Sequence, residues 1–534
     1  MQEIRIGFGQ INPVVGDFEH NSAQILKLMS EASASCDLLV FGELALCGYP
    51  LGDLSYRGDI IERSEAALES LVAASARFPE LCVVVGHVSQ ASTGPNTQVS
   101  YAKAHNSATA FSGGKVLARY DKRRLPNYDV FDDWRNFVPG TNDGTFSFKN
   151  RSIGMAICED IWGDTQRADE LSAAGVELLV VPNGSPYTRT KQNDRRRAAR
   201  DYQRGFALAY ANLAGGQDEL VFDGDSFLLD KGGNEIMRTG SKPGLYSERS
   251  SAVEILDDDP ATLYEVLVTG LRDYCAKTGQ TKIVLGISGG IDSALSAAIA
   301  CEAIGSANVL GVMLPSRYSS EHSLSDAREL AKNLGFEARE VPIDGPHQAF
   351  EALLSLTDLA AENIQARIRA VILMGISNSE GRLLLTTGNK SEVAVGYSTI
   401  YGDSAGGFAP IKDVLKTDVW RLSRWLNSSR EQVLIPVSSI EKAPSAELRP
   451  NQTDQDSLPD YRVLDDVLRL LIEKFATVPE IVALGFDHEL VAEIDEMVRK
   501  AEWKRSQGAI GTKTTALSFG IGRRVPITTR FGKL

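Results

Sequence analysis

Short β-rich runs alternate with amphipathic stretches over the first 240 residues of the chain. The β-rich runs, each predicted to be a strand, occupy residues 4–10, 37–43, 82–88, 106–112, 152–160, 177–184 and 225–230. Three stretches, at 19–34, 60–77 and 191–213, are amphipathic and are predicted to be helices. Strands mixed with helices in this way predict an α/β domain in which helices cover layers of sheet.

The second half of the chain alternates more regularly, beginning at Pro260. Predicted elements follow in the order helix 261–279, strand 282–288, helix 292–305, strand 308–316, helix 326–335, strand 337–344, helix 359–378 and strand 382–388. Short apolar strands separated by helices are typical of a parallel sheet with helices on both faces. We therefore predict a doubly wound α/β fold for this half.

Between the two halves, over residues 239–260, the pattern breaks into turn-forming and acidic residues. A chain of 534 residues is also too long for one hydrophobic core, because single cores stop growing at roughly 250–300 residues. We therefore predict two domains, at 1–250 and 260–534.

The composition is that of an ordinary globular protein, with 43% hydrophobic and 24% charged residues. No run approaches the roughly 18 apolar residues that cross a bilayer, and the first residues are not signal-like, so we expect a cytoplasmic protein without a membrane partner. A formal charge of −14 argues against general affinity for nucleic acid. The six cysteines have neither disulfide-type nor zinc-type spacing, so most are expected to be reduced and buried.

The C-terminal end is locally basic within this acidic chain. Between 499 and 533, basic residues at 499, 500, 504, 505, 513, 523, 524, 530 and 533 face a single acid, Glu502. Such a segment is compatible with a small anionic ligand. Without further information, Lys504 and Arg505 would be interpreted as solvated surface charge.

The first candidate site consists of Glu43 and Cys158, near the ends of predicted strands, and Lys122, which closes another strand-like run. Taken alone, Cys158 fits a buried core cysteine. A buried Glu or Lys is costly unless it is paired, however, so Glu43 and Lys122 at strand ends favour a shared polar site. In such a site Glu43 would take the thiol proton, and Lys122 would stabilise the oxyanion formed when the thiolate attacks a carbonyl.

Four segments, FGELALCGYPLGDL, YDKRRLPNYDVFDDWRNF, GMAICEDIW and NGSPY, resemble the nitrilase superfamily and specifically the glutaminase domains fused to NAD synthetases. The resemblance implies a nitrilase-like αββα sandwich with a Glu-Lys-Cys triad made of Glu43, Lys122 and Cys158. It also implies that glutamine is bound by Tyr128, Ser185 and Lys191.

Two positions in this half depart from the family pattern. Gly42 precedes the base where the family usually has proline, which we interpret as a local backbone matter. Asp133 stands where the family usually has a second glutamate that helps to orient the lysine. The carboxylate available to Lys122 is therefore shorter in this chain.

The second candidate site is the segment LGISGGIDSALSA, which places Ser288, Gly289 and Gly290 between a strand and a helix N-terminus. Backbone N–H groups can converge on an anion there, and the helix dipole adds to the attraction. The segment fits neither a Walker A loop nor GxGxxG, and a generic glycine turn is the alternative interpretation. SGGxDS after a strand resembles the N-type ATP pyrophosphatases, which cleave ATP between its α and β phosphates.

Further segments narrow this resemblance to NAD synthetases: residues 362–378, 383–420, 501–507 and 519–528. It implies a Rossmann-type, adenine nucleotide α-hydrolase-like domain. The ATP contacts implied by the resemblance are Gly286, Ile287, Ser288, Gly289, Gly290, Ile291, Asp292, Ser293, Thr387 and Lys416. The implied contacts to deamido-NAD are Asn363, Arg367, Glu392 and Lys504. Mg²⁺ would be held by Asp292 and Glu392, since it prefers carboxylates and substrate phosphates. Gln455 departs from the family, which usually carries an acid there.

The resemblance implies a glutamine-dependent ligase that adenylates deamido-NAD and replaces AMP by ammonia. Its substrates would be the small molecules deamido-NAD, ATP and glutamine, and we expect a homo-oligomer. Two alternatives remain open: another glutamine-using ATP pyrophosphatase, such as a GMP or asparagine synthetase, or an amidase joined to a nucleotide-binding module without catalytic activity. The intact residues Ser288, Asp292, Thr387 and Glu392 argue against the second alternative.

Overall fold

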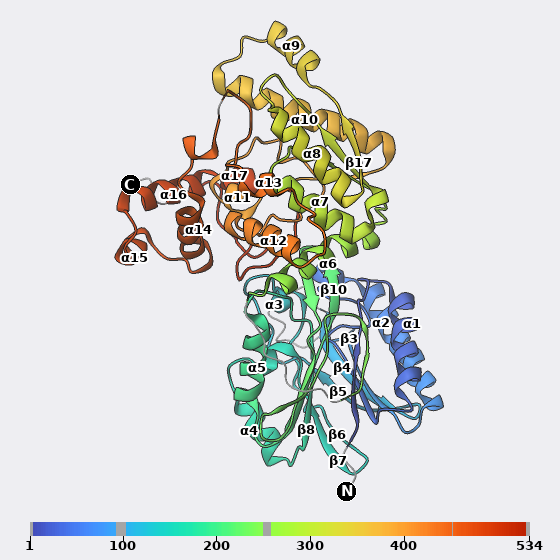
Figure 1. Cartoon of the computed structure of the whole chain (residues 1–534). Coiled ribbons are helices and arrows are strands. Elements are labelled where there is room, and N and C mark those ends of the chain that lie inside the picture. Colours follow the sequence, from blue (N-terminus) through green and yellow to red (C-terminus); the bar gives the residue numbers. More distant parts are fainter. Residues whose placement is uncertain (1–3, 92–102, 249–257, 451, 530–534) are drawn as a thin grey trace. The chain divides into compact units, whose positions relative to one another are not determined.

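The chain forms two compact units, Met1–Asp257 and Asp258–Leu534 (Figure 1). The computed structural model describes residues 4–91, 103–248, 258–450 and 452–529. Residues 249–257 of the stretch predicted to separate the two halves lie outside the described residues, as do the basic residues 530 and 533.

The N-terminal unit contains two six-stranded mixed sheets and a two-stranded one. The first sheet has the order β14 (Gly244–Tyr246), β1 (Ile6–Gln10), β2 (Leu38–Phe41), β3 (Cys82–Gln90), β4 (Ala104–Ser112) and β5 (Lys115–Asp121). The second has the order β13 (Glu235–Arg238), β12 (Phe227–Leu229), β9 (Ala207–Asn212), β8 (Leu178–Asn183), β7 (Arg151–Met155) and β6 (Thr145–Phe148). The small sheet pairs β10 (Ala214–Gln217) with β11 (Leu220–Asp223).

Helices cover the outer face of each large sheet, which gives four layers in all (Figure 1). Helices α1 (Phe18–Ala32) and α2 (Gly58–Ala74) pack on the first sheet, and α4 (Gln166–Ala173) and α5 (Lys191–Tyr202) on the second. Between the sheets, buried side chains such as Val40, Val84 and Val180 form one continuous core. The predicted αββα sandwich is confirmed.

The start of α1 illustrates how the sequence specifies a helix. Asp17 accepts a hydrogen bond from the backbone N–H of His20 at 3.0 Å and so caps the helix. Phe18, Ile25 and Met29 are buried on one face, as the amphipathic pattern predicts.

The predicted helix over 191–213 is wrong in its second half. Helix α5 ends at Tyr202, and residues 207–212 form β9, a buried strand between β8 and β12. Gly205 separates the two with a φ of 79°, in the left-handed region where a helix cannot continue. Short apolar runs do not distinguish a strand from the end of a buried helix, and here pairing with two neighbouring strands decides.

The C-terminal unit is built on a parallel four-stranded sheet with the order β17 (Glu337–Glu340), β16 (Val309–Met313), β15 (Ile283–Gly286) and β18 (Leu383–Leu385). Helices α7 (Ile291–Ile304) and α8 (Glu321–Leu334) connect β15 to β16 and β16 to β17. Helix α10 (Asp358–Glu380) then leads back past β15 to β18. Since parallel crossovers are right-handed, this reversal places α10 on the opposite face. The predicted doubly wound fold is confirmed.

The reversal also fixes where ligands are expected. In open α/β sheets, ligands bind at the carboxyl ends of the strands where the strand order reverses. That point lies between β15, which ends at Gly286, and β18, which ends at Leu385. The SGGIDS segment and Thr387 follow these two strands directly.

The remaining helices complete the two units. They are α3 (Asp133–Asn136), α6 (Pro260–Thr278), α9 (Asp344–Leu353), α11 (Lys390–Val395), α12 (Lys416–Ser428), α13 (Val437–Glu441), α14 (Tyr461–Leu468), α15 (Val478–Ala483), α16 (His488–Lys500) and α17 (Glu502–Arg505). Helices α11, α14 and α16 share a core in which Ala394, Leu464 and Ile494 are fully buried. All six cysteines are free and buried, as predicted. Among the described residues, no helix is long and apolar enough to cross a membrane.

Candidate active sites

Cys158 lies in a sharp turn that follows β7. Its φ is 43°, and the side chain is buried at the start of the 3-10 turn Cys158–Ile161. The left-handed conformation is costly for a residue other than glycine and is therefore imposed by its surroundings. Asp160 supplies the constraint, since its carboxylate accepts from the N–H of Ile157 at 2.9 Å and of Arg124 at 2.8 Å. The turn thus presents the thiol at the end of a buried strand.

Glu43 follows β2, and three donors surround its carboxylate. Oε1 accepts from Lys122 Nζ at 2.6 Å and from Asn106 Nδ2 at 2.7 Å, while Oε2 accepts from the N–H of Gly184 at 2.9 Å. The side chains of Glu43 and Lys122 are completely buried. The structure therefore brings together two residues that are 79 positions apart in the chain.

Asp133 completes the surroundings of Lys122. Its Oδ2 lies 2.6 Å from Lys122 Nζ, and its Oδ1 accepts from the hydroxyl of Tyr49 at 3.2 Å. The shorter side chain that distinguishes this chain from the family pattern therefore still reaches the lysine. Burial alone would lower the pKa of Lys122, but Asp133 and Glu43 outweigh it and raise that pKa well above its ordinary value. Lys122 is consequently a permanent cation.

Gly42 also departs from the family, and its surroundings explain why it carries no ordinary side chain. A Cβ at this position would lie 2.6 Å from Leu213 Cδ2 and 2.9 Å from Asn183 O. The N–H of the next residue, Glu43, donates to the same carbonyl oxygen at 3.1 Å. The close approach of two backbones thus fixes Glu43 beside β8.

The resting state of Cys158 is the neutral thiol. Burial raises its pKa well above the ordinary value, and the charge of Glu43 adds to that rise while Lys122 opposes it. A thiol in this state needs a base to become a nucleophile. The arrangement of Glu43, Lys122 and Cys158 supplies a carboxylate, a cation and a thiol within one buried polar site.

The three residues implied in glutamine binding differ in exposure. Tyr128 is 50% exposed and donates from its hydroxyl to Glu159 Oε2 at 2.8 Å. Lys191, the first residue of α5, holds Nζ 4.3 Å from the centroid of the Trp162 ring. Burial lowers the pKa of Lys191, and Arg195 lowers it further, while Cys158 acts in the opposite direction. Lys191 therefore lies within electrostatic reach of the thiol.

Ser185 is buried and is held by two side chains that the sequence did not single out. Asn212 Oδ1 accepts from its N–H at 2.9 Å, and Arg195 Nε donates to its Oγ at 3.1 Å. Neither partner lies in a segment that carries the family resemblance, so the sequence did not point to them. Asn106, which begins the predicted strand 106–112, was also missed, because it reaches Glu43 only in the fold.

In the C-terminal unit, the SGGIDS segment is a tight turn into α7. Gly289 has a φ of +75°, and a Cβ there would lie 2.3 Å from Ser323 O. Gly290 is the N-cap of α7, and Ser293 Oγ donates to its carbonyl oxygen at 2.9 Å. Glycine is therefore required for the turn itself, and the N–H groups of the turn are placed at a helix N-terminus, which attracts anions. Gly286 ends β15, while Ile287 and Ile291 are buried.

Asp292 joins the turn to the loop that follows β18. Its Oδ1 accepts from Asn389 Nδ2 at 2.9 Å, and its Oδ2 pairs with Lys416. Lys416 Nζ also lies 3.4 Å from Glu392 Oε1. Burial raises the pKa of Glu392, Lys416 opposes this rise, and Asp292 adds to it. Two carboxylates thus share one buried cation, and Thr387 lies half-buried in the same loop. Asn389 was missed because it reaches Asp292 only in the fold.

The described parts of the chain hold no cluster of three or more His, Cys, Asp or Glu side chains suited to a metal ion. Asp292 and Glu392 are therefore a pair rather than a complete protein coordination shell. Such a pair matches the way Mg²⁺ is held in nucleotide sites, by one or two carboxylates together with substrate phosphates.

The residues implied in deamido-NAD binding converge on residues 396–400. Asn363 Oδ1 accepts from Thr399 Oγ1 at 2.7 Å, and Arg367 Nε donates to Ile400 O at 3.3 Å. Lys504 Nζ donates to Gly396 O at 2.8 Å and to Ser398 O at 2.7 Å. A partly open pocket borders this segment. Its lining includes Glu392, Ser398, Ile400, Asp403, Lys412 and Lys504.

The surface-charge interpretation of Lys504 and Arg505 is wrong. Lys504 is bound to two backbone carbonyls, and the buried Arg505 donates to Ala394 O and pairs with Glu502. Gln455, the position at which the family usually carries an acid, is exposed in this chain. Its neighbour Asp454 is buried. Burial raises the pKa of Asp454, Lys416 lowers it and Asp292 raises it, so Asp454 is the acid near this site.

Comparison with family models separates the chain into the same two halves. Residues 5–245 match the model described as carbon-nitrogen hydrolase, and residues 263–508 match the model described as NAD synthase. The first match contains Glu43, Lys122 and Cys158, and the second contains the SGGIDS turn, Glu392 and Lys504.

Two curated relatives span nearly the whole chain. The glutamine-dependent NAD(+) synthetase of Thermotoga maritima is 41% identical, with 99% of each chain covered. That of Synechocystis is 42% identical, with 98% of this chain and 99% of the relative covered. Among solved structures, glutamine-dependent NAD+ synthetase from Acinetobacter baumannii in complex with adenosine diphosphate has a TM-score of 0.76 and 36% identity, covering 98% of both chains. The same fold occurs in the glutamine-dependent NAD(+) synthetase from Cytophaga hutchinsonii, with a TM-score of 0.85, 23% identity and coverage of 100% and 99%.

Proposed function

The chain belongs to the glutamine-dependent NAD(+) synthetases, and we propose that it carries out the reaction of this family with the two sets of residues described above. It is an ATP-dependent ligase that forms a carbon–nitrogen bond with an amide donor. The overall reaction converts deamido-NAD, ATP, glutamine and water into NAD, AMP, diphosphate and glutamate. ATP is a substrate.

In the N-terminal unit, Glu43 takes the proton of Cys158, and the thiolate attacks the side-chain carboxamide of glutamine. Lys122 stabilises the oxyanion of the tetrahedral intermediate. Glu43 then returns the proton to the leaving ammonia, and a thioester remains on Cys158. A water molecule, deprotonated by Glu43, hydrolyses the thioester to glutamate and restores the thiol. Tyr128, Ser185 and Lys191 hold the glutamine.

In the C-terminal unit, the carboxylate of deamido-NAD attacks the α-phosphorus of ATP and releases diphosphate. Ammonia attacks the resulting acyl adenylate, and AMP leaves. The N–H groups of the SGGIDS turn and the ammonium of Lys416 offset phosphate charge, and Thr387 contacts the nucleotide. Asn363, Arg367 and Lys504 hold deamido-NAD.

Asp292 and Glu392 would hold Mg²⁺. Their carboxylate oxygens suit this ion, and Lys416 pairs with both carboxylates. Bound Mg²⁺ neutralises phosphate charge during the transfer. Asn389 keeps Asp292 oriented.

The observation that carries this proposal is the presence, in one chain, of a buried thiol with its carboxylate and lysine and of an SGGIDS turn linked to Asn389 and Lys416. The test is to supply ATP, Mg²⁺, glutamine and deamido-NAD and to follow NAD, AMP, diphosphate and glutamate. We expect the four products in equal amounts. Formation of glutamate without AMP would support an amidase with a non-catalytic nucleotide-binding module. AMP formation that does not depend on deamido-NAD would support another amidotransferase.

The cytoplasmic location and the homo-oligomer are also proposed. Light scattering at several protein concentrations tests the oligomeric state. The mass of a single chain at every concentration would contradict the proposed homo-oligomer. Nucleic acid is not expected among the partners because the chain carries a formal charge of −14.

A further inference from the structure

Arg195 is a completely buried cation in the N-terminal unit. It lies on α5, one helical turn after Lys191, and its side chain has no solvent exposure. A buried charge is costly unless it is paired and hydrogen-bonded, so its contacts show what the residue does. Nε donates to Ser185 Oγ at 3.1 Å, and Nη2 donates to Ser185 O at 2.7 Å and to Pro186 O at 3.2 Å.

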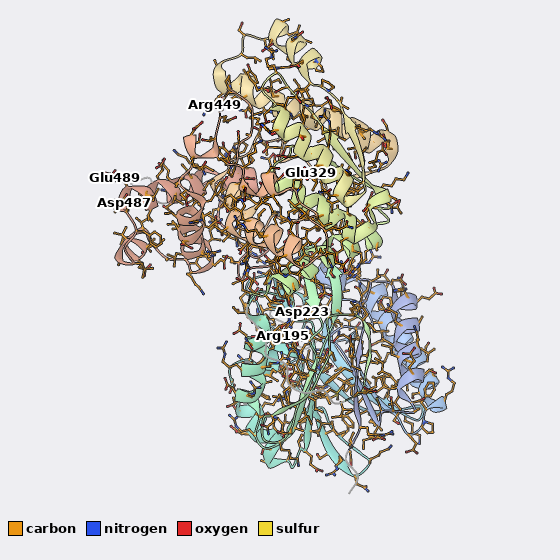
Figure 2. The ribbon with its side chains drawn as sticks, in the orientation of Figure 1. Arg195, Asp223, Glu329, Arg449, Asp487 and Glu489 are labelled. Carbon is orange, nitrogen blue, oxygen red and sulfur yellow. The ribbon has the colours of Figure 1, made fainter. Side chains whose placement is uncertain are left out.

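Asp223 holds the guanidinium from the other side. Its Oδ1 lies 2.8 Å from Arg195 Nη2, and its Oδ2 accepts from Gln192 Nε2 at 3.0 Å. Figure 2 shows the two labelled side chains next to each other. Burial would lower the pKa of Arg195, but Asp223 outweighs burial and raises it. Arg195 is therefore always charged, and α5 and β11 fix its position.

Asn212 also holds the backbone of Ser185. Asn212 Oδ1 accepts from the N–H of Ser185 at 2.9 Å, and Asn212 Nδ2 donates to its carbonyl oxygen at 3.1 Å. The hydroxyl group, in contrast, receives a hydrogen bond from Arg195. Arg195 thus holds the hydroxyl and the carbonyl of Ser185, while Asn212 holds its N–H and carbonyl groups.

This contact limits the direction in which the Ser185 hydroxyl can donate its proton. A serine hydroxyl has one proton to donate and two lone pairs, whereas a guanidinium only donates. Because Arg195 occupies a lone pair, the Ser185 proton cannot be given to Arg195 and is directed elsewhere. A ligand oxygen can then accept that proton.

We propose that Arg195 is a positioning residue for glutamine binding: it holds Ser185 Oγ so that the hydroxyl donates to an oxygen of the bound glutamine. This inference rests on the proposed function, in which Ser185 contacts glutamine. It adds a residue and a direction of hydrogen bonding to that contact. Since Arg195 acts on binding and not on the thiol, its loss affects the KM for glutamine far more than kcat.

Arg195→Lys is the first test, since it keeps a cation beside Asp223 but cannot supply both Nε and Nη2. We expect the KM for glutamine to rise about tenfold, with kcat changed less than threefold. NAD synthesis from ammonium salts should stay at the wild-type rate. Arg196→Lys is the matched control, because Arg196 is the next residue of α5, is buried, and pairs with Asp225 and Glu235. An unchanged KM in Arg195→Lys, or an equal rise in Arg196→Lys, would overturn the proposal.

A double-mutant cycle with Ser185→Ala tests whether Arg195 acts through Ser185. We expect Ser185→Ala to raise the KM for glutamine and Arg195→Lys to add little further change in that background. Full additivity, or a Ser185→Ala variant with normal KM, contradicts the proposal. Absence of glutamine-dependent NAD synthesis in the wild type would instead refute the proposed function. Should Arg195→Lys fail to fold, Asp223→Asn loosens the same guanidinium, and an unchanged KM there also contradicts the proposal.

Discussion

Lys122 and Asp133 form a buried ion pair in which Lys122 Nζ lies 2.6 Å from Asp133 Oδ2. Asp133 is the residue that departs from the family pattern by being shorter. The short α3 begins at Asp133, and Tyr49 donates to the other carboxylate oxygen. The backbone and Tyr49 therefore place the shorter side chain where it reaches the lysine.

Asp133→Asn should lower glutamine-dependent kcat at least tenfold, which corresponds to about 1.4 kcal/mol of transition-state stabilisation. Without the Asp133 charge, Glu43 is the one remaining charged partner of Lys122 described in the site, and the lysine is held less firmly where it stabilises the oxyanion. Steady-state glutaminase assays measure this effect, and synthesis from ammonium should be retained. Asp132→Asn, a change of the preceding carboxylate, is the control. Equal losses in both variants would show that the effect is not specific to the ion pair.

Asp292→Asn should abolish NAD formation from both glutamine and ammonium, with a loss of at least a hundredfold, while some glutaminase activity remains. The change removes a charge from the pair that would hold Mg²⁺ and from the partner of Lys416. NAD and glutamate are measured in parallel. NAD formation near the wild-type rate would refute the metal-binding role of Asp292.

Lys504→Ala should raise the apparent KM for deamido-NAD about tenfold and more than the KM for ATP. Lys504 donates to the carbonyl oxygens of Gly396 and Ser398, next to the segment that Asn363 and Arg367 contact. Hydrogen bonds to charged groups contribute about 1.5–3 kcal/mol. Lys500→Ala is the control, because the Lys500 side chain is 67% exposed and pairs with Glu496 on the same helix. A normal KM for deamido-NAD in Lys504→Ala would rule out the binding role.

Low pH should reduce the folding stability of the C-terminal unit, because Asp413 becomes protonated. Burial raises the pKa of this carboxylate, but Lys390, 3.0 Å away, and Lys513 outweigh burial and lower the pKa below its ordinary value. Asp413 therefore stabilises the fold fully above the unfolded pKa of about 3.9, and this contribution is lost as the pH falls through the lower folded pKa.

Hydrogen exchange of α11 at decreasing pH, corrected for the intrinsic exchange rate, measures this loss. In Asp413→Asn, the loss of exchange protection with falling pH should disappear. The free energy of unfolding of this variant at neutral pH should be lower by about 3–5 kcal/mol, because the buried Lys390 loses a partner. The same acid dependence in the variant and the wild type would assign the effect to other carboxylates.

The sequence predicted the fold where apolar runs are short and bounded. Three of the four parallel strands of the C-terminal unit, β15, β16 and β18, follow directly from such runs, whereas β17 has the sequence EARE and is mostly exposed. Residues 191–213 show the limit, because Gly205 divides a helix from a strand and only pairing with β8 and β12 identifies the strand.

The site was predicted in part, for a related reason. Glu43, Lys122 and Cys158 lie at or near the ends of strand-like runs, and this position can be recognised in the sequence. Arg195 and Asn389 act through contacts with Ser185 and Asp292 that exist only in the folded chain. Their burial could not be predicted from their residue types, since charged and amide side chains are usually exposed.

The central claim is that one chain divides the reaction between a thiol site and an ATP site, and Cys158→Ala tests it most directly. Alanine provides no thiolate, so glutamine yields no ammonia, whereas the SGGIDS turn, Asp292 and Lys416 are untouched. We predict no NAD from glutamine and wild-type synthesis from ammonium salts, with a rate that rises with ammonium concentration and with pH in the alkaline range. Glutamine-dependent synthesis by the folded variant, or loss of its ammonium-dependent synthesis, would contradict the account.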